Sequence, residues 1–294
     1  MMKSASDRLR PVPATLPTEG QVLAVVESIV LRPVSDGQDM AAATLAKSGL
    51  LAISIPAIFG GADISNVVVA EAISRLSTWN MRTAELFVHH LIALELLRTS
   101  GTTEQRRAVY SRVALGEVFH FSAGPTVPPM ARLVRSGLSF MVEPAPSMPP
   151  PRGTDWHVLI ATAAGMGEVA FILSFEDAQP SDGDVSPTAP PVSPDNVLVL
   201  GLDALSLAAL MQAFLRGAIC RGAIDAELGK YDIGDTSASA IEFELLDAIV
   251  LKVASIIDGI QVDEPTLDLA QTERLCEALQ TACLRCTDEV TPPQ

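Results

Sequence analysis

The spacing of apolar residues changes twice along this chain, and the change limits the folds that the chain can adopt. From about Glu19 to Leu115, and again from Asp203 onward, apolar residues recur every three or four positions. That spacing places them on one face of an α-helix. Between Val118 and Leu200 the apolar runs are short and nearly continuous, as in buried strands. The sequence therefore predicts a mostly α protein with a small central β domain, in the order helical bundle, β domain, helical bundle.

The same changes predict the limits of the domains. We expect a flexible N-terminal segment at 1–18, an N-terminal helical domain at 19–117, a small β domain with Pro-rich loops at 118–200, and a truncated C-terminal helical bundle at 201–294. The Pro-rich stretches cannot sustain a helix or a central strand. Residues 180–194 are predicted to be mobile, because Pro, Ser, Asp and Gly leave little there to bury.

Local signals support this order of elements. Thr102 can cap a helix, and Gln105 three positions later completes a capping box. The adjacent Gly60–Gly61 predicts a tight turn between helices. Hairpins are expected around Ser136–Gly137 and around Gly165–Gly167, each between two strand-like runs.

Composition excludes several classes of partner. Apolar residues make up 48% of the chain and aromatics only 4%, so Ala, Leu, Val and Ile must build the interior. The net charge of -15 argues against binding to nucleic acid and to anionic membrane surfaces. We recognise neither a secretory signal nor an uninterrupted apolar stretch of the ~20 residues that a membrane span needs. A soluble, cytoplasmic protein is expected.

Cysteine and histidine patterns do not predict a metal site. Cys283 and Cys286 form a CxxC pair, but no second pair or nearby His completes a tetrahedral set, so reduced cysteines in helices are the preferred interpretation. His89 and His90 are neighbours in a predicted helix and point about 100° apart. One of them is expected in the core and the other in solvent.

Two motifs at a characteristic separation suggest a family. The stretch GLLAISIPAIFGG is followed by a long helix and then by SGTTEQRRAVYSRVALGE. This arrangement resembles the N-terminal domain of the acyl-CoA dehydrogenase family, which shows an apolar G-L-x-x-x-x-x-P before a Gly-Gly turn and later G-T-x-E-Q-R ending in G-E. The resemblance is good from Leu50 to Glu117, weaker across the β region, and moderate from Ala204 to about Cys286.

The resemblance implies an FAD-dependent oxidoreductase acting on the CH–CH group of acyl thioesters. Flavoprotein members bind FAD between the β domain and the C-terminal bundle, and a Glu removes the α-proton while hydride passes to the flavin. At the family's flavin turn this chain has FSAGPTVPP, in which Ser122 and Thr126 are the remaining hydroxyls. Lys230 stands where the family has an Arg that reaches the FAD phosphate. These three are the predicted cofactor-binding residues; a loop serine in solvent and an ordinary helix-end cation are the alternatives for Ser122 and Lys230.

Departures from the family pattern leave the catalytic residues unassigned. The Thr–Glu pair of the flavin turn is missing, and the sequence stops at TPPQ, before the segment that often carries the catalytic Glu. The first helix of the C-terminal bundle offers only Asp203, which is interpreted as an N-cap. The alternative is therefore a non-catalytic member of the fold that serves as an interaction or partner subunit.

The helix predicted near residues 240–258 suggests assembly. Its apolar positions form one stripe and an adjoining one, comprising Ile241, Leu245, Ile249, Val253 and Ile256 or Ile257, and Phe243, Leu246 and Val250. That surface is wider than one helix-helix seam requires. A homo-oligomer is expected, or a hetero-oligomer with a full-length relative, and Val250 is the position that would separate an interface from a core.

Overall fold

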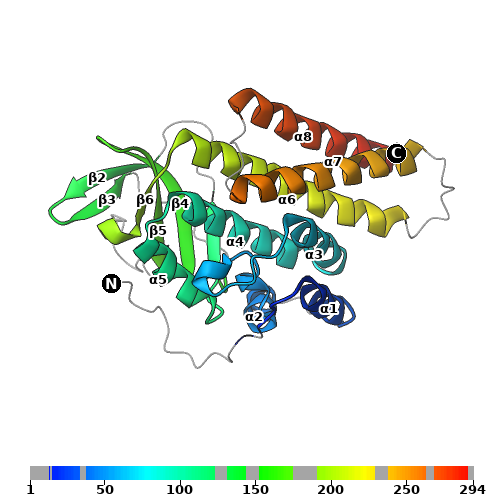
Figure 1. Cartoon of the computed structure of the whole chain (residues 1–294), viewed down its shortest axis with the longest axis horizontal. Coiled ribbons are helices and arrows are strands. Elements are labelled where there is room, and N and C mark those ends of the chain that lie inside the picture. Colours follow the sequence, from blue (N-terminus) through cyan, green and yellow to red (C-terminus); the bar gives the residue numbers. More distant parts are fainter. Residues whose placement is uncertain are drawn as a thin grey trace, which may run out of the picture.

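The computed structural model describes residues 13, 15–33, 38–122, 131–143, 152–174, 191–228, 238–262 and 268–290. The first helices are α1 (Glu19–Val30), α2 (Gln38–Ser48), α3 (Asn66–Trp79), α4 (Met81–Ser100) and α5 (Thr103–Val113). The strands that follow are β1 (Phe119–Ser122), β2 (Arg132–Ser136), β3 (Ser139–Glu143), β4 (Trp156–Ala163), β5 (Gly167–Ser174) and β6 (Val197–Val199). The last helices are α6 (Leu202–Leu228), α7 (Ala238–Gln261) and α8 (Leu269–Val290). The predicted fold class is confirmed (Figure 1).

Local sequence signals explain where several elements begin and turn. Thr102 and Gln105 form the predicted capping box at the start of α5. The Gln105 side chain also donates to the backbone carbonyl of Val197 at 2.9 Å, so the same residue ties α5 to β6. Gly60 adopts a φ of 85° in the turn before α3, a conformation that favours glycine.

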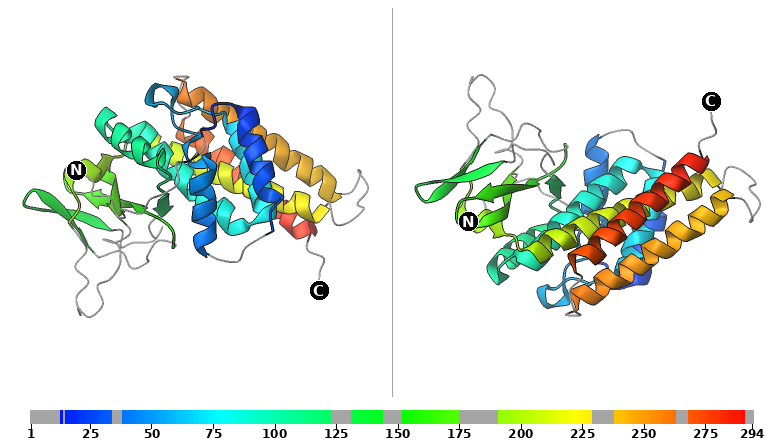
Figure 2. Two further views of the ribbon diagram at one scale, coloured as in Figure 1. Left: turned by 90° about the horizontal axis from the view of Figure 1, so that it is seen from below. Right: turned by 90° about the horizontal axis from the view of Figure 1, so that it is seen from above.

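One mixed sheet forms the β domain. Its strand order is β3-β2-β4-β5-β6, with β1 paired to β4 in parallel. The first half of β4 pairs with β1 and its end pairs with β2, so both strands share one edge of β4. The two predicted hairpins are confirmed as the antiparallel pairs β2–β3 and β4–β5. Figure 2 shows the sheet at one end of the molecule, beside the helices.

Glu117, the last residue of the G-E motif, joins the helices to the sheet. Its carboxylate accepts a hydrogen bond of 2.6 Å from the Trp156 indole and forms an ion pair of 3.3 Å with Arg112. The Arg112 guanidinium also lies 4.9 Å from the centre of the Trp156 ring. These contacts fix the first residue of β4 against the end of α5.

Helix α6 is the central helix of the molecule and packs against α3, α4, α7 and α8. By length and composition it could cross a membrane, but 50% of its most apolar stretch is buried, as in the core helix of a soluble protein. Gly222 lies directly on α3, where a Cβ atom would overlap the carbonyl oxygen of Ser74 and the hydroxyl of Ser77. A glycine is therefore required for this close approach.

The structure shows which side of helix α7 faces the core, a question that the sequence left open. Leu246, Val250 and Val253 are fully buried. Val250 therefore belongs to the core of a single chain, because the face that carries it packs against α6 and α8. Ile241 and Leu245 are 55% and 48% exposed, so only the first part of the other stripe is uncovered.

The segment predicted to be mobile ends in ordered structure. Residues 180–190 lie outside the described residues. Val192, however, is 1% exposed and forms an antiparallel bridge with Phe140 of β3, with a nitrogen–oxygen distance of 2.7 Å. The prediction was wrong for this end of the segment, because Val192 has an apolar side chain that the second face of the sheet buries.

Candidate functional site

All four histidines of the chain gather where α4 meets β1 and β4. His89 and His90 lie on α4, His120 on β1 and His157 on β4. The parallel register places His120 directly beside His157. The ring centres of His89 and His120 are 4.5 Å apart, and those of His120 and His157 are 5.8 Å apart.

His90 has a structural role in this cluster. It is fully buried; its Nδ1 accepts a 3.0 Å hydrogen bond from the Phe119 amide, so its Nε2 carries the proton and donates to the Leu51 carbonyl at 3.0 Å. Burial lowers the pKa of His90 to about 4. The neutral ring therefore joins α4 to the start of β1 and to the turn after α2, and His90 is the core histidine that was predicted.

His89 is not in solvent as predicted. It is half-buried and its ring packs against His120. Its Nδ1 atom is buried and has no hydrogen-bond partner among the described residues. Burial lowers the pKa of His89, and nearby Arg216 lowers it further. The helix geometry was predicted correctly, but β1 covers this side of α4.

Ser122, the first predicted flavin contact, lies between two imidazoles. Its hydroxyl is 2.8 Å from Nε2 of His157 and 3.3 Å from Nδ1 of His120. One serine proton can serve only one of these nitrogens, so the other ring must donate to the serine oxygen. Burial lowers the pKa of His157 to about 4 and that of His120 to about 3, which keeps both rings neutral at pH 7. Nδ1 of His157 is also buried without a partner among the described residues.

A small cavity opens beside His89 and His120. Its volume is about 200 Å³, and its lining comprises Ala41, Arg82, Glu85, Leu86, His89, His120 and Arg152. Glu85 is the only carboxylate in this described lining, and it is exposed. Imidazoles and guanidiniums therefore dominate the polar chemistry of the cavity.

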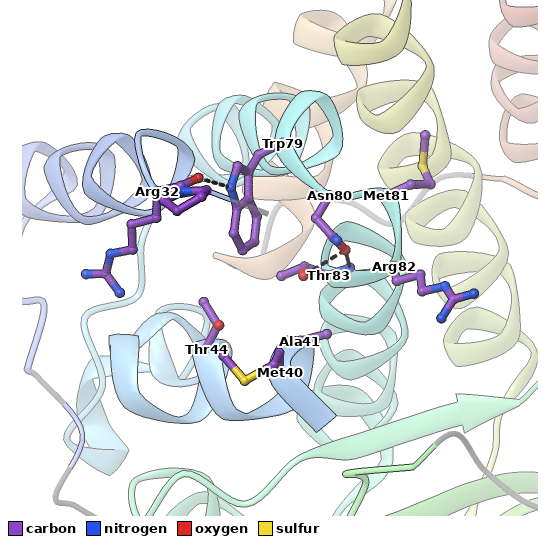
Figure 3. Close-up of a pocket in the computed structure, with 10 residues that line it drawn as sticks. Arg32, Met40, Ala41, Thr44, Trp79, Asn80, Met81, Arg82 and Thr83 are labelled. Carbon is purple, nitrogen blue, oxygen red and sulfur yellow. Dashed lines mark hydrogen bonds between the residues drawn. The ribbon is translucent and has the colours of Figure 1, made fainter. Parts of the chain in front are cut away.

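A larger cavity adjoins the first and shares Ala41 and Arg82 with it. It has a volume of about 490 Å³ and lies between α2, the residues that follow α1, the end of α3 and the first turn of α4. Figure 3 shows the Trp79 ring projecting into this space, with Met40 and Thr44 on the opposite wall. Both cavities therefore follow the same side of α4.

A third cavity, of about 490 Å³, lies between the end of α4 and the start of α6 and includes Asp203. The predicted N-cap role of Asp203 was wrong: α6 begins at Leu202, and Asp203 lies in its first turn. Its charge still favours the positive end of the helix. No histidine or arginine lines this cavity within the described residues.

One buried carboxylate of the described chain, Glu95, lies away from the histidines. Glu95 of α4 is 4% exposed and accepts a 2.8 Å hydrogen bond from Gln261 of α7. Its second oxygen has no partner among the described residues, and burial raises its pKa. Glu95 faces α7, whereas His89 faces β1, so the two groups serve different parts of α4.

The remaining predicted site residues fall elsewhere. Thr126 and Lys230 lie outside the described residues, and their roles stay predictions. All four cysteines are thiols outside any disulfide, and Cys220 of α6 lies close to Cys283 of α8. Among the described residues there is no group of three or more His, Cys, Asp or Glu suited to a metal ion.

The sequence did contain one overlooked signal for the histidine cluster. Phe119–His120 and Trp156–His157 are both aromatic–histidine pairs in predicted strands. The structure aligns the two pairs in parallel, aromatic beside aromatic and histidine beside histidine. Their separation in sequence hid this match.

Comparisons with known proteins agree with the architecture. Residues 33–117 match the acyl-CoA dehydrogenase N-terminal domain. No curated protein sequence matches the chain. Among solved structures, butyryl-CoA dehydrogenase from Megasphaera elsdenii is 12% identical with a TM-score of 0.68, and the alignment covers 92% of this chain and 86% of that one.

Two further solved structures are similar. The prolyl acyl carrier protein oxidase AnaB is 16% identical with a TM-score of 0.69, over 94% of this chain and 88% of that one. TdsC from Paenibacillus sp. A11-2, in complex with FMN and indole, is 14% identical with a TM-score of 0.66, over 92% and 82% of the two chains. At these identities the likeness shows a shared fold.

Proposed function

We propose that this chain, which belongs to the acyl-CoA dehydrogenase family, is a flavin-dependent oxidoreductase acting on the CH–CH group of an acyl thioester. FAD is the proposed flavin, following the family resemblance, although TdsC was solved with FMN. The observation that carries the proposal is the cavity between α4 and β1, where neutral imidazoles and arginines line a space at the junction of helices and sheet.

The residues present at this junction fit the ring of a flavin. The buried Nδ1 of His89, which has no partner among the described residues, needs a hydrogen-bond partner that a molecule bound in the cavity would supply. Arg152 would favour an anionic part of the cofactor. Ser122 and His120, on the same strand, would lie beside it. A bound flavin supplies the acceptor for two electrons.

The protein's own groups then have defined tasks. Leu86 contributes an apolar wall to the cavity, and His89 and His120 hold neutral rings there at pH 7. A neutral imidazole can accept a proton, and of the two described rings that line the cavity His89 is the one with a buried nitrogen that has no partner among the described residues. We therefore assign the proton-accepting role to His89. Glu85 is too exposed to act as a buried base.

Flavin binding and flavin reduction test this function separately. The visible absorbance of the purified full chain should show a flavin band, or the band should shift when FAD or FMN is titrated in. Anaerobic addition of short acyl-CoA thioesters should bleach the band. His89→Gln should still bind the flavin but should no longer show bleaching. Arg135→Gln, on the exposed hairpin, is the control and should retain both binding and bleaching. Failure of both flavins to bind would contradict the proposal.

A non-catalytic partner subunit is the second candidate. It is favoured by one observation: among the described residues, no buried carboxylate lines the cavity beside the histidines. A chain of this kind would bind flavin weakly or not at all and would not bleach with any thioester. It would instead raise the activity or stability of a full-length relative when the two are mixed.

We also propose that the chain assembles with a second copy or with a relative through α7. Ile241 and Leu245 leave an exposed apolar stripe on this helix, which a second helix would cover. Leu245→Glu should yield a folded monomer in sedimentation at micromolar concentration, where the wild type is an oligomer. A wild-type monomer would contradict the homo-oligomer.

A further inference from the structure

The two adjoining cavities follow one side of α4 and suit an extended small molecule. They share Ala41 and Arg82, and their volumes are about 490 and 200 Å³. Between Met81, which lines the larger, and His89, which lines the smaller, an α-helix rises about 12 Å. We call this space the α4 channel. Its size is within the range of small-molecule sites.

One end of the α4 channel is built for an apolar or aromatic group. The Trp79 indole donates a 2.8 Å hydrogen bond to the Arg32 carbonyl, so its polar edge is satisfied and its ring is held in place. Met40 and Met81 also line the space and are 48% and 39% exposed. Aromatic rings and thioethers make favourable contacts with flat or branched apolar groups.

The charge of the α4 channel is opposite to that of the protein. Its described lining carries Arg32, Arg82 and Arg152 but only one carboxylate, Glu85, in a chain whose net charge is -15. Within the described residues, none of the three arginines takes part in an ion pair. Guanidiniums without a counter-ion in a hollow attract carboxylates, which they bind through two parallel hydrogen bonds.

Arg82 holds the position between the two cavities. Figure 3 shows the Arg32 and Arg82 side chains extending in opposite directions from the space beside Trp79. Because Arg82 lines both cavities, a ligand that begins beside Trp79 and continues toward His89 would pass this residue. An anionic group is therefore expected at Arg82, and the apolar part beside Trp79.

We infer that the α4 channel binds an extended organic carboxylate whose apolar or aromatic segment contacts Trp79 and whose carboxylate pairs with Arg82. This ligand is separate from the thioester of the proposed function, which would react beside His89. Binding of the carboxylate itself requires no flavin, so the two proposals fail separately.

Titration of the full chain with 4-phenylbutyrate tests the inference, with the neutral 4-phenylbutanamide as the matched ligand. Isothermal titration calorimetry gives the affinity. Tryptophan fluorescence reports the place, because the chain has two tryptophans and Trp156 is buried away from the α4 channel. Trp79→Phe should remove the fluorescence change. The amide should bind about tenfold more weakly than the acid, the loss expected for one charge-assisted pair.

Arg82→Gln should lower the affinity for the acid by the same factor and leave the affinity for the amide unchanged. Arg135→Gln should alter neither affinity. Arg82→Lys, which keeps the charge without the fork, should fall between the wild type and Arg82→Gln and provides a second variant if the first does not fold. Equal affinities for acid and amide, unaltered binding by Arg82→Gln, or no saturable binding at millimolar ligand would overturn the inference. Carboxylate binding without any flavin binding would support the inferred ligand of the α4 channel and contradict the proposed enzyme function. Flavin binding without carboxylate binding would contradict the inferred ligand and leave the enzyme function supported.

Discussion

The contact between α3 and α6 differs from the junction between α4 and β1 in how closely it is packed and in whether its buried polar groups have partners. At the first, Gly222 lets two helices touch, and the Ser77 hydroxyl donates to the Ser74 carbonyl at 2.7 Å. At the second, buried nitrogens of His89 and His157 lack partners among the described residues, and a cavity remains. Both contacts join long elements, yet only one is fully packed and paired.

This difference separates stability from function within the molecule. A packed contact with satisfied polar groups gains free energy of folding and offers nothing to a ligand. Unpaired polar groups beside a cavity reduce stability and gain partners when a ligand binds. Substitutions at the two places should therefore have different effects.

The largest effect is expected from Gly222→Ala. The added Cβ would overlap the Ser74 carbonyl, which belongs to the helix backbone and cannot move aside. We expect a loss of about 3 kcal/mol or more in the free energy of unfolding, measured by urea denaturation. Gly20→Ala is the control: nothing lies within 4 Å of its Cβ position in α1, so stability should stay within about 1 kcal/mol. Equal effects of the two changes would contradict the packing described here.

Acid should destabilise the histidine junction by an intermediate amount. Burial holds the pKa of His90 and His157 at about 4, below the value of about 6.5 in an unfolded chain. The unfolded chain therefore binds more protons between these values, and stability falls as the pH drops from 7 toward 4. We expect each of these two rings to cost about 2 kcal/mol of stability by pH 4.5, measured by urea unfolding at several pH values.

His157→Leu should flatten that pH dependence, because it removes one of the groups that must take up a proton on unfolding. A pH dependence that was equally steep in this variant, or a wild-type stability that was constant from pH 7 to 4.5, would show that these rings do not pay a desolvation cost.

The smallest effect is expected at Glu95. Burial raises the pKa of this carboxyl, so its contribution to stability is present at low pH and is lost as the pH rises through the raised value. Glu95→Gln should therefore increase stability at pH 7 by about 1 kcal/mol, since the amide oxygen can still accept from Gln261. Glu277→Gln on the exposed side of α8 should change little. A loss of stability at Glu95 would mean that its charge is compensated.

Much of the fold follows from local patterns in the sequence. The capping box of Thr102 and Gln105, the Gly60 turn and the two hairpins each depend on residues close together in the chain, and all are present. The domain limits stay predictions. The sequence left the exposed face of α7 open, because two adjoining apolar stripes look alike in sequence and only packing selects the one that carries Val250.

The candidate site could not be predicted in the same way. His89, His120 and His157 come from three elements, and only the parallel pairing of β1 with β4 brings them together. Arg82 has no special signal on an exposed turn of α4. The binding role proposed for Arg82 depends on the two cavities that this residue lines, and these are visible only in the folded chain.

Hydrogen–deuterium exchange of the full chain, with and without FAD, measures directly whether the α4–β1 junction is the binding site. We predict that FAD slows exchange in peptides covering residues 81–90 and 119–122 and leaves the α3–α6 contact, in residues 66–79 and 214–228, unchanged. Protection centred on the start of α6 near Asp203, or protection at neither place, would contradict this assignment.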